Sequence, residues 1–280
     1  MPHDPGRWIE RATALRADGR ALLGGHRTAA ASGESFPLTS PRDGGKLADV
    51  AACGEHDVER AVALARRGAD AGSWSRQPAK HRQRVLARWA DLLEGAREDL
   101  ALLLALETGK PIRTALTVEM RSVVQSIRWY AEIADKLEGR HPQAGPHAVA
   151  LVEREPAGVV GVVLPWNFPL SMVGYDLAPA LAIGNSVVVK PSELAPLSVL
   201  RACELAVEAG VPPDVLAVLP GSGPVAGGAL GRHHDVDVIT VTGAPATGRA
   251  FLEYSARSNG KRVWPKLGGK SAVIICRDAP

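Results

Sequence analysis

The sequence predicts an α/β fold in which a parallel, Rossmann-like sheet follows an N-terminal helical layer. Two observations carry this prediction. From about residue 158 onward short apolar runs alternate with amphipathic segments, and the earlier residues carry apolar stripes at helical spacing. The chain has 280 residues, 46 % of them hydrophobic and 22 % charged, which is the composition of an ordinary folded protein. A packed core is therefore expected.

Residues 1–137 are predicted to form the helical layer. Within residues 82–94, Val85, Trp89 and Leu92 recur at intervals of three and four, so they share one face of a helix. Comparable stripes run through residues 57–69, 99–108 and 118–137.

Residues 138–157 are predicted to form an arm. Glycines and prolines break any helix at the start of this segment, and residues 148–154 alternate like an exposed strand. The segment is interpreted as an arm or hairpin.

Residues 158–266 are predicted to hold the sheet. Apolar strands that alternate with helices are typical of a parallel sheet covered on both faces. Strands are expected at residues 159–164, 186–190, 215–219 and 236–241, and helices at residues 169–183, 195–209, 224–231 and 245–258. A further buried strand is expected at residues 271–276, as the start of a following domain within residues 267–280.

Unusual residues follow these strands at their carboxyl ends, where ligands of parallel sheets bind. Glycines before a helix let backbone N–H groups approach a pyrophosphate. Two such turns, at residues 221–227 and 243–248, indicate a dinucleotide site. Each turn alone also fits an ordinary strand-to-helix connection.

Lys190 and Glu193 follow the second strand of the sheet. The lysine can donate to ribose hydroxyls, and a carboxylate that accepts from the ribose 2′-hydroxyl would repel a 2′-phosphate. The pair therefore favours NAD over NADP. The alternative is a surface ion pair that caps a helix.

Several motifs together, by their order and spacing, resemble the NAD(P)-dependent aldehyde dehydrogenase superfamily. They are Pro165-Trp166-Asn167-Phe168-Pro169, Lys190-Pro191-Ser192-Glu193, residues 221–227, Val241-Thr242-Gly243 and Leu267-Gly268-Gly269-Lys270-Ser271. Residues 72–75, 107–112 and 127–132 are similar to the branch that oxidises γ-glutamyl-γ-aminobutyraldehyde and related amino-aldehydes. The resemblance runs from about Trp8 to the end and corresponds to roughly the first half of a family member.

The resemblance implies an aldehyde dehydrogenase-type fold whose catalytic domain is largely missing, NAD as cofactor, an aldehyde substrate and a homo-oligomer built through the arm. It also implies a mechanism in which a cysteine thiolate attacks the aldehyde, hydride passes to the nicotinamide, and the resulting thioester is hydrolysed. Asn167 matches the oxyanion-hole asparagine, although an asparagine there also fits a bond to its own turn. Cofactor contacts are implied for Pro165, Trp166, Lys190, Glu193, Gly223, Gly243 and Ala244, the last in place of a hydroxyl residue.

Two departures from the family pattern bear on catalysis. Lys266 stands where the family has an acidic general base, and an ordinary lysine, with a pKa of about 10.4, keeps its proton at neutral pH. Deacylation is therefore expected to fail. No cysteine matches the family's nucleophile, and Cys276 is expected to be inert in a buried strand. The chain is interpreted as a gene fragment, with an NAD-binding pseudoenzyme or an interaction subunit as alternatives.

Composition excludes several other classes. The 33 basic and 30 acidic residues are interleaved, which argues against a nucleic-acid surface. Residues 156–175 lack charge but contain three prolines, so no membrane helix is expected. Three scattered cysteines predict neither disulfides nor a zinc site, the eight histidines show no metal spacing, and the expected compartment is the cytoplasm.

Overall fold

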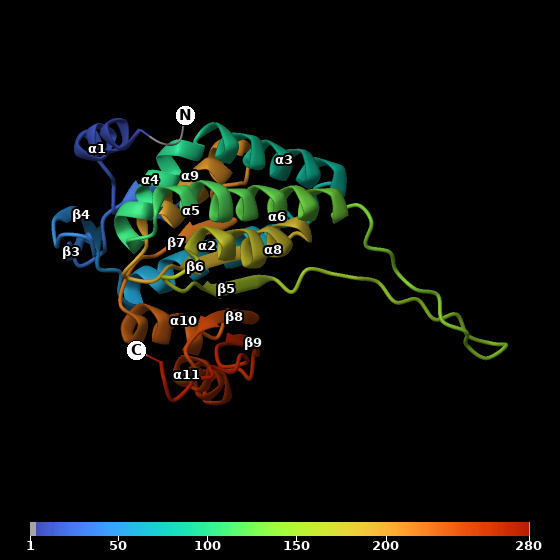
Figure 1. Ribbon diagram of the computed structural model, residues 1–280. Helices are drawn as coiled ribbons and strands as arrows, with labels where there is room; N and C mark the ends of the chain where they lie inside the picture. Colours follow the sequence, from blue (N-terminus) through green and yellow to red (C-terminus); the bar gives the residue numbers. More distant parts are fainter. Residues whose placement is uncertain (1–3, 280) are drawn as a thin grey trace.

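The computed structural model describes residues 4–279 and confirms the α/β fold class (Figure 1). Its main sheet has seven strands in the order β2-β1-β7-β6-β5-β8-β9. The five strands from β7 to β9 in this order are parallel, and β1 joins β7 antiparallel. The strands are β1 (Ala21–Leu23), β2 (His26–Thr28), β5 (Val159–Val163), β6 (Ser186–Lys190), β7 (Leu216–Val218), β8 (Val238–Gly243) and β9 (Arg262–Leu267).

Both faces of the parallel strands are buried, as their apolar sequences predict. Along β5, Val160 and Val162 pack into one core, whereas Val159 and Val163 pack into the core on the other face. Because strand side chains alternate between faces, a continuous valine run supplies both cores at once.

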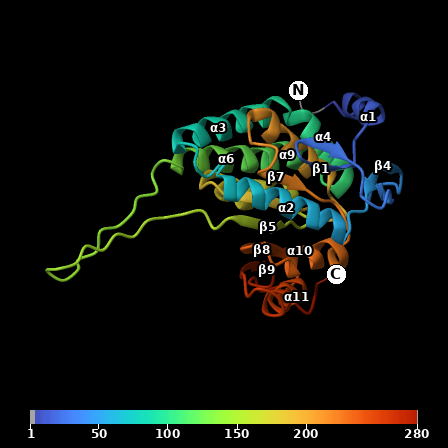
Figure 2. The ribbon, with the colours of Figure 1, turned by 180° about the vertical axis from the view of Figure 1, so that it is seen from behind.

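Helices form a layer on each face (Figures 1 and 2). The larger layer holds α3 (Ala79–Gly95), α4 (Arg97–Thr108), α6 (Met120–Ile133), α8 (Ala178–Ala182) and α9 (Leu197–Ala209). The smaller layer holds α2 (Glu55–Ala71), α10 (Gly228–Arg232) and α11 (Pro245–Ala256). Two buried indoles tie the larger layer together, since Trp74 Nε1 donates to Leu181 O at 2.7 Å and Trp89 Nε1 donates to Ala202 O at 2.8 Å.

Short helices and single π turns complete the helical part. The short helices are α1 (Pro5–Ala14), α5 (Ile112–Thr114) and α7 (Pro169–Met172), and the π turns are η1 (Ala115–Glu119), η2 (Val173–Leu177) and η3 (Gly223–Gly227). The helices expected at residues 169–183 and 224–231 therefore form as mixed α and π segments. π turns of this kind often occur at functional sites.

The strand order reverses beside β5. From β5 the chain moves outward through β6 and β7, and it then returns to the other side of β5 as β8 and β9. Such a switch point leaves a crevice beyond the carboxyl ends of the central strands, where open parallel sheets bind ligands.

The N-terminal layer contains strands that its helical stripes do not predict. Besides β1 and β2, the antiparallel pair β3 (Ser35–Thr39) and β4 (Lys46–Ala51) forms a separate two-stranded sheet. These strands have three to six residues each, so their sequences carry too little periodicity to distinguish them from loops.

The segment 138–157 leaves the body as a long arm (Figures 1 and 2). Only one bridge, between Arg140 and Val152, joins its two limbs, so the hairpin is barely paired. Val149 and Leu151 are exposed along it.

The strand and the burial expected at residues 271–276 are both wrong. The last strand is β9, which ends at Leu267, and Val273, Ile274, Ile275 and Cys276 are exposed. Apolar, β-branched residues form a strand only where a neighbour accepts their backbone hydrogen bonds, and no described strand lies beside them.

No helix within residues 4–279 has the length and apolar character that crossing a membrane requires.

Candidate functional site

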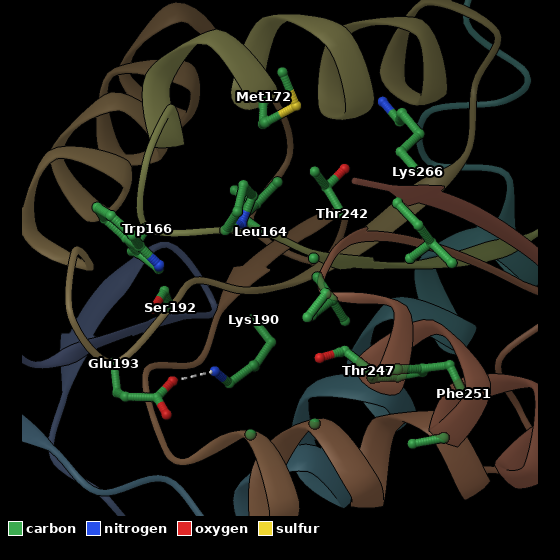
Figure 3. A pocket seen from close by; sticks show the side chains of 18 of the residues that line it. Leu164, Trp166, Met172, Lys190, Ser192, Glu193, Thr242, Thr247, Phe251 and Lys266 are labelled. Atoms are coloured by element: carbon green, nitrogen blue, oxygen red, sulfur yellow. Dashed lines mark hydrogen bonds and ion pairs between the residues drawn. The ribbon is translucent and has the colours of Figure 1, made fainter. Parts of the chain in front are cut away.

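A pocket of about 870 Å³ lies beyond the carboxyl ends of β5, β6 and β8 (Figure 3). All nine site residues that the sequence suggests line it: Pro165, Trp166, Asn167, Lys190, Glu193, Gly223, Gly243, Ala244 and Lys266. The structure thus brings together residues from the ends of β6 and β8, from the segments that follow β5, β6, β7 and β8, and from β9. Their roles remain predictions.

Lys190 and Glu193 form an ion pair at one end of the pocket, with Nζ and Oε2 3.1 Å apart. Burial lowers the pKa of Lys190, because it disfavours the charged ammonium. Burial opposes ionisation of Glu193 as well, but backbone hydrogen bonds and Lys190 prevail and lower the pKa of this carboxyl. The ion pair belongs to the pocket wall rather than to a helix cap.

The loop after Lys190 is anchored by a buried carboxylate. Glu107, at the end of α4, accepts hydrogen bonds from the backbone N–H of Leu197 at 2.7 Å and of Ser198 at 3.1 Å, where α9 begins. Burial raises the pKa of Glu107 to about 7. The carboxyl group thereby fixes the far end of the loop that carries Glu193.

Asn167 lies in the loop after β5, and a lysine holds that loop from behind. Lys110 donates to the backbone carbonyl of Asn167, pairs with buried Glu119, and places its Nζ 3.9 Å from the centre of the Phe168 ring. Within residues 4–279 the hydrogen bond from Lys110 reaches the backbone carbonyl of Asn167, and no hydrogen bond joins the Asn167 side chain to its own turn. Its amide is therefore available to a ligand in the pocket.

The turns after β7 and β8 bring backbone close to the pocket. Gly223 and Gly243 line it, and a Cβ added at Gly223 would meet no atom within 4 Å. Beside Gly243, α11 begins with Pro245 and points its first turn of N–H groups toward this wall. Thr247, in that first turn, also lines the pocket and supplies a hydroxyl (Figure 3).

Lys266 lies across the pocket from Glu193 (Figure 3). Its ammonium forms an ion pair with Oδ1 of Asp176, a buried residue of η2. Thr240 Oγ1 donates to the same oxygen at 3.1 Å. The second carboxylate oxygen of Asp176 is buried and has no hydrogen-bond partner among residues 4–279, and the same holds for the hydroxyl of the pocket residue Thr242.

No cysteine lies among the described residues that line the pocket. Cys53 and Cys203 are buried elsewhere, and burial raises the pKa of each thiol to about 12. A thiol with that pKa is almost wholly protonated at neutral pH and is a poor nucleophile.

Sequence reasoning did not find every side chain of the site. Asp176 and Met172 lie within an apolar helical run, where nothing in the sequence marks them. Thr242 lies near the end of β8 and Thr247 in the first turn of α11, so their closeness to the turn at Gly243 was the available signal. Within residues 4–279 no cluster of potential metal ligands occurs.

Residues 28–280 match the aldehyde dehydrogenase family. The chain belongs to that family. Over 273 residues it is 44 % identical to an NADP/NAD-dependent aldehyde dehydrogenase of Escherichia coli K12, covering 98 % of this chain and 55 % of the relative. Over 260 residues it is 47 % identical to an aminoacetaldehyde dehydrogenase of Pseudomonas aeruginosa, covering 92 % of this chain and 52 % of the relative.

Solved structures of this family superimpose closely. The γ-glutamyl-γ-aminobutyraldehyde dehydrogenase of Burkholderia cenocepacia is 47 % identical with a TM-score of 0.93, over 95 % of this chain and 54 % of that one. An indole-3-acetaldehyde dehydrogenase of P. syringae, solved with NAD⁺ and IAA, is 46 % identical with the same TM-score of 0.93, over the same 95 % and 54 %. The chain spans about half the length of the relatives that it matches.

Proposed function

We propose that this chain binds NAD in the pocket and that it belongs to an NAD-dependent oxidation of an aldehyde to a carboxylate. The observation that carries the proposal is the buried Lys190 with Glu193 on the pocket wall, at the carboxyl end of β6. A half-exposed carboxylate held by a buried ammonium is suited to accept a hydrogen bond from a ribose hydroxyl.

The pocket fits a dinucleotide on four grounds. It encloses about 870 Å³, which is large for a small-molecule site. Gly223 leaves open space where a side chain would intrude. The first turn of α11 offers backbone donors to a pyrophosphate, and the buried hydroxyl of Thr242 lacks a protein partner.

The proposed orientation of NAD follows from placing its adenosine ribose at Glu193. With the adenosine ribose at Glu193, the pyrophosphate would lie against the turns at Gly223 and Gly243. The nicotinamide would then reach the end of the pocket at Asn167 and Lys266. Bound NAD would supply the hydride acceptor, and Asn167 would supply amide N–H donors where negative charge develops on the aldehyde oxygen.

The aldehyde class rests on the relatives. Two of them, from P. aeruginosa and B. cenocepacia, are named for amino-aldehydes. We propose an amino-aldehyde of this kind as the substrate.

One observation favours a second function, NAD binding without turnover. Lys266 is engaged with Asp176 as a cation, so it cannot accept a proton from water. With no cysteine thiol in the described pocket, the residues in hand bind and orient rather than complete the reaction. Aldehyde-dependent formation of NADH by the chain would overturn this second function.

The proposed binding is tested by calorimetric titration with NAD and NADP. We expect NAD to bind the chain more tightly than NADP. Gly223→Leu should weaken NAD binding at least about tenfold, because the added side chain fills the pocket. The matched control is Gly95→Leu, at the exposed end of α3, where an added Cβ also meets nothing within 4 Å. Unchanged NAD affinity in Gly223→Leu would place the site elsewhere.

We propose that the arm at residues 138–157 joins copies of the chain. Its exposed Val149 and Leu151 support a contact that buries them. The free cysteines Cys53, Cys203 and Cys276 support a reducing compartment such as the cytoplasm.

A further inference from the structure

The far end of the pocket carries an unusual arrangement of charge. The charged side chains among the described pocket residues are Lys190, Glu193 and Lys266, and the first two neutralise each other. The counter-charge of Lys266 is Asp176, whose side chain is only 4 % exposed, whereas the Lys266 side chain is 46 % exposed. Lys266 lines the pocket and Asp176 does not.

This pair is therefore oriented, with its positive member toward the pocket and its negative member behind the wall. The exposed Lys266 side chain lines this end of the pocket and the buried Asp176 side chain does not, so we expect a ligand there to meet a positive potential although the pair is neutral overall. Thr240 donates a hydrogen bond to Asp176 and further reduces the negative charge that the pocket senses.

We infer that the Lys266–Asp176 pair makes the pocket bind NADH more tightly than NAD⁺. The inference rests on the proposed function, which places the nicotinamide at this end. The oxidised ring carries a positive charge and the reduced ring carries none, so a positive potential disfavours the oxidised form alone. By linkage, tighter binding of NADH than of NAD⁺ also shifts the redox equilibrium of the bound cofactor toward NADH.

Two variants should move the preference in opposite directions. Asp176→Asn keeps the side-chain shape but leaves Lys266 uncompensated, so the ratio of the NAD⁺ dissociation constant to the NADH dissociation constant should rise about threefold. The double variant Asp176→Asn with Lys266→Met removes the oriented pair without stranding a buried charge, so the ratio should fall about threefold. A role in packing alone would not produce opposite signs.

The experiment titrates the full chain with NAD⁺, NADH and AMP at low ionic strength. AMP occupies only the adenosine end, so its affinity should be the same in the wild type and both variants. The matched control is Lys46→Met, which removes the lysine of an exposed Lys46–Asp49 pair outside this pocket and should leave all three affinities unchanged.

The outcomes separate the two proposals. Tighter binding of NADH, with opposite shifts in the two variants, supports the inference. If AMP and both dinucleotides bind but neither variant changes the ratio, the inference is wrong and the proposed site stands. If AMP and both dinucleotides fail to bind, the proposed function falls and takes this inference with it.

Discussion

The two ends of the pocket each pair a lysine with a carboxylate, and they bury opposite members of the pair. At one end Lys190 is buried and Glu193 is the exposed partner, whereas at the other Asp176 is buried and Lys266 is exposed. At each end, the exposed member shows the larger part of its side chain to a ligand. One pocket thus presents a carboxylate to a sugar at one end and a cation to a ring at the other.

The comparison also concerns stability. A charge inside the protein costs solvation free energy, and its partner offsets that cost. Removing Lys266 strands the buried carboxylate of Asp176, whereas removing Lys190 leaves the Glu193 carboxylate in contact with water. The consequences should therefore depend on which member is replaced.

The largest expected effect is on folding, at the Lys266 end. Lys266→Met leaves the carboxylate of Asp176 buried without its cation, so the free energy of unfolding should fall by about 2 kcal/mol. Adding Asp176→Asn should restore most of the loss, because no buried charge remains. Urea denaturation of the three proteins measures this. Equal stability of Lys266→Met and the wild type would mean that Lys266 does not stabilise the buried carboxylate of Asp176.

At the adenosine end, the buried member should matter for binding rather than for folding. Lys190→Met removes a poorly solvated charge, so the free energy of unfolding should change by less than about 1 kcal/mol. NAD affinity should fall about tenfold, because a charged donor to the ribose is lost. Calorimetric titration with NAD, together with urea denaturation, checks both parts. A large loss of stability with unchanged NAD affinity would mean that Lys190 serves folding rather than binding.

The smallest expected effect is on selectivity. Glu193→Gln keeps an oxygen acceptor but removes the negative charge that opposes a 2′-phosphate. The preference for NAD over NADP should narrow by about fivefold, mainly through tighter NADP binding. Competition between the two dinucleotides measures the ratio. An unchanged ratio would indicate that Glu193 does not set the choice between NAD and NADP. A relative at 44 % identity is named for both cofactors.

The loops of the site could be predicted from the sequence because their position follows from topology. Residues that end parallel strands meet at one sheet edge, which is why Asn167, Lys190 and Gly243 share a pocket although they are far apart in the chain. Asp176 could not be predicted, because its approach to Lys266 depends on how η2 packs across the ends of β8 and β9. A single acidic residue in an apolar helical segment carries no signal of that contact.

The sequence predicts the wrong strand at the end of the sheet for a related reason. Residues 262–267 contain a proline and two basic residues, so they lack the apolar run of a central strand, yet they form the edge strand β9 where these residues are tolerated. Residues 271–276 have that run and form no strand. Strand formation here is decided by a neighbour and not by composition.

The central claim is that the two ends of one NAD site present opposite charges to the ligand. A crystal structure of the chain with NAD tests this claim most directly. We predict an adenosine ribose hydroxyl within about 3 Å of a Glu193 carboxylate oxygen, with the nicotinamide at the end of the pocket lined by Asn167 and Lys266. NAD bound outside this pocket, or bound with the nicotinamide beside Glu193, would contradict the account.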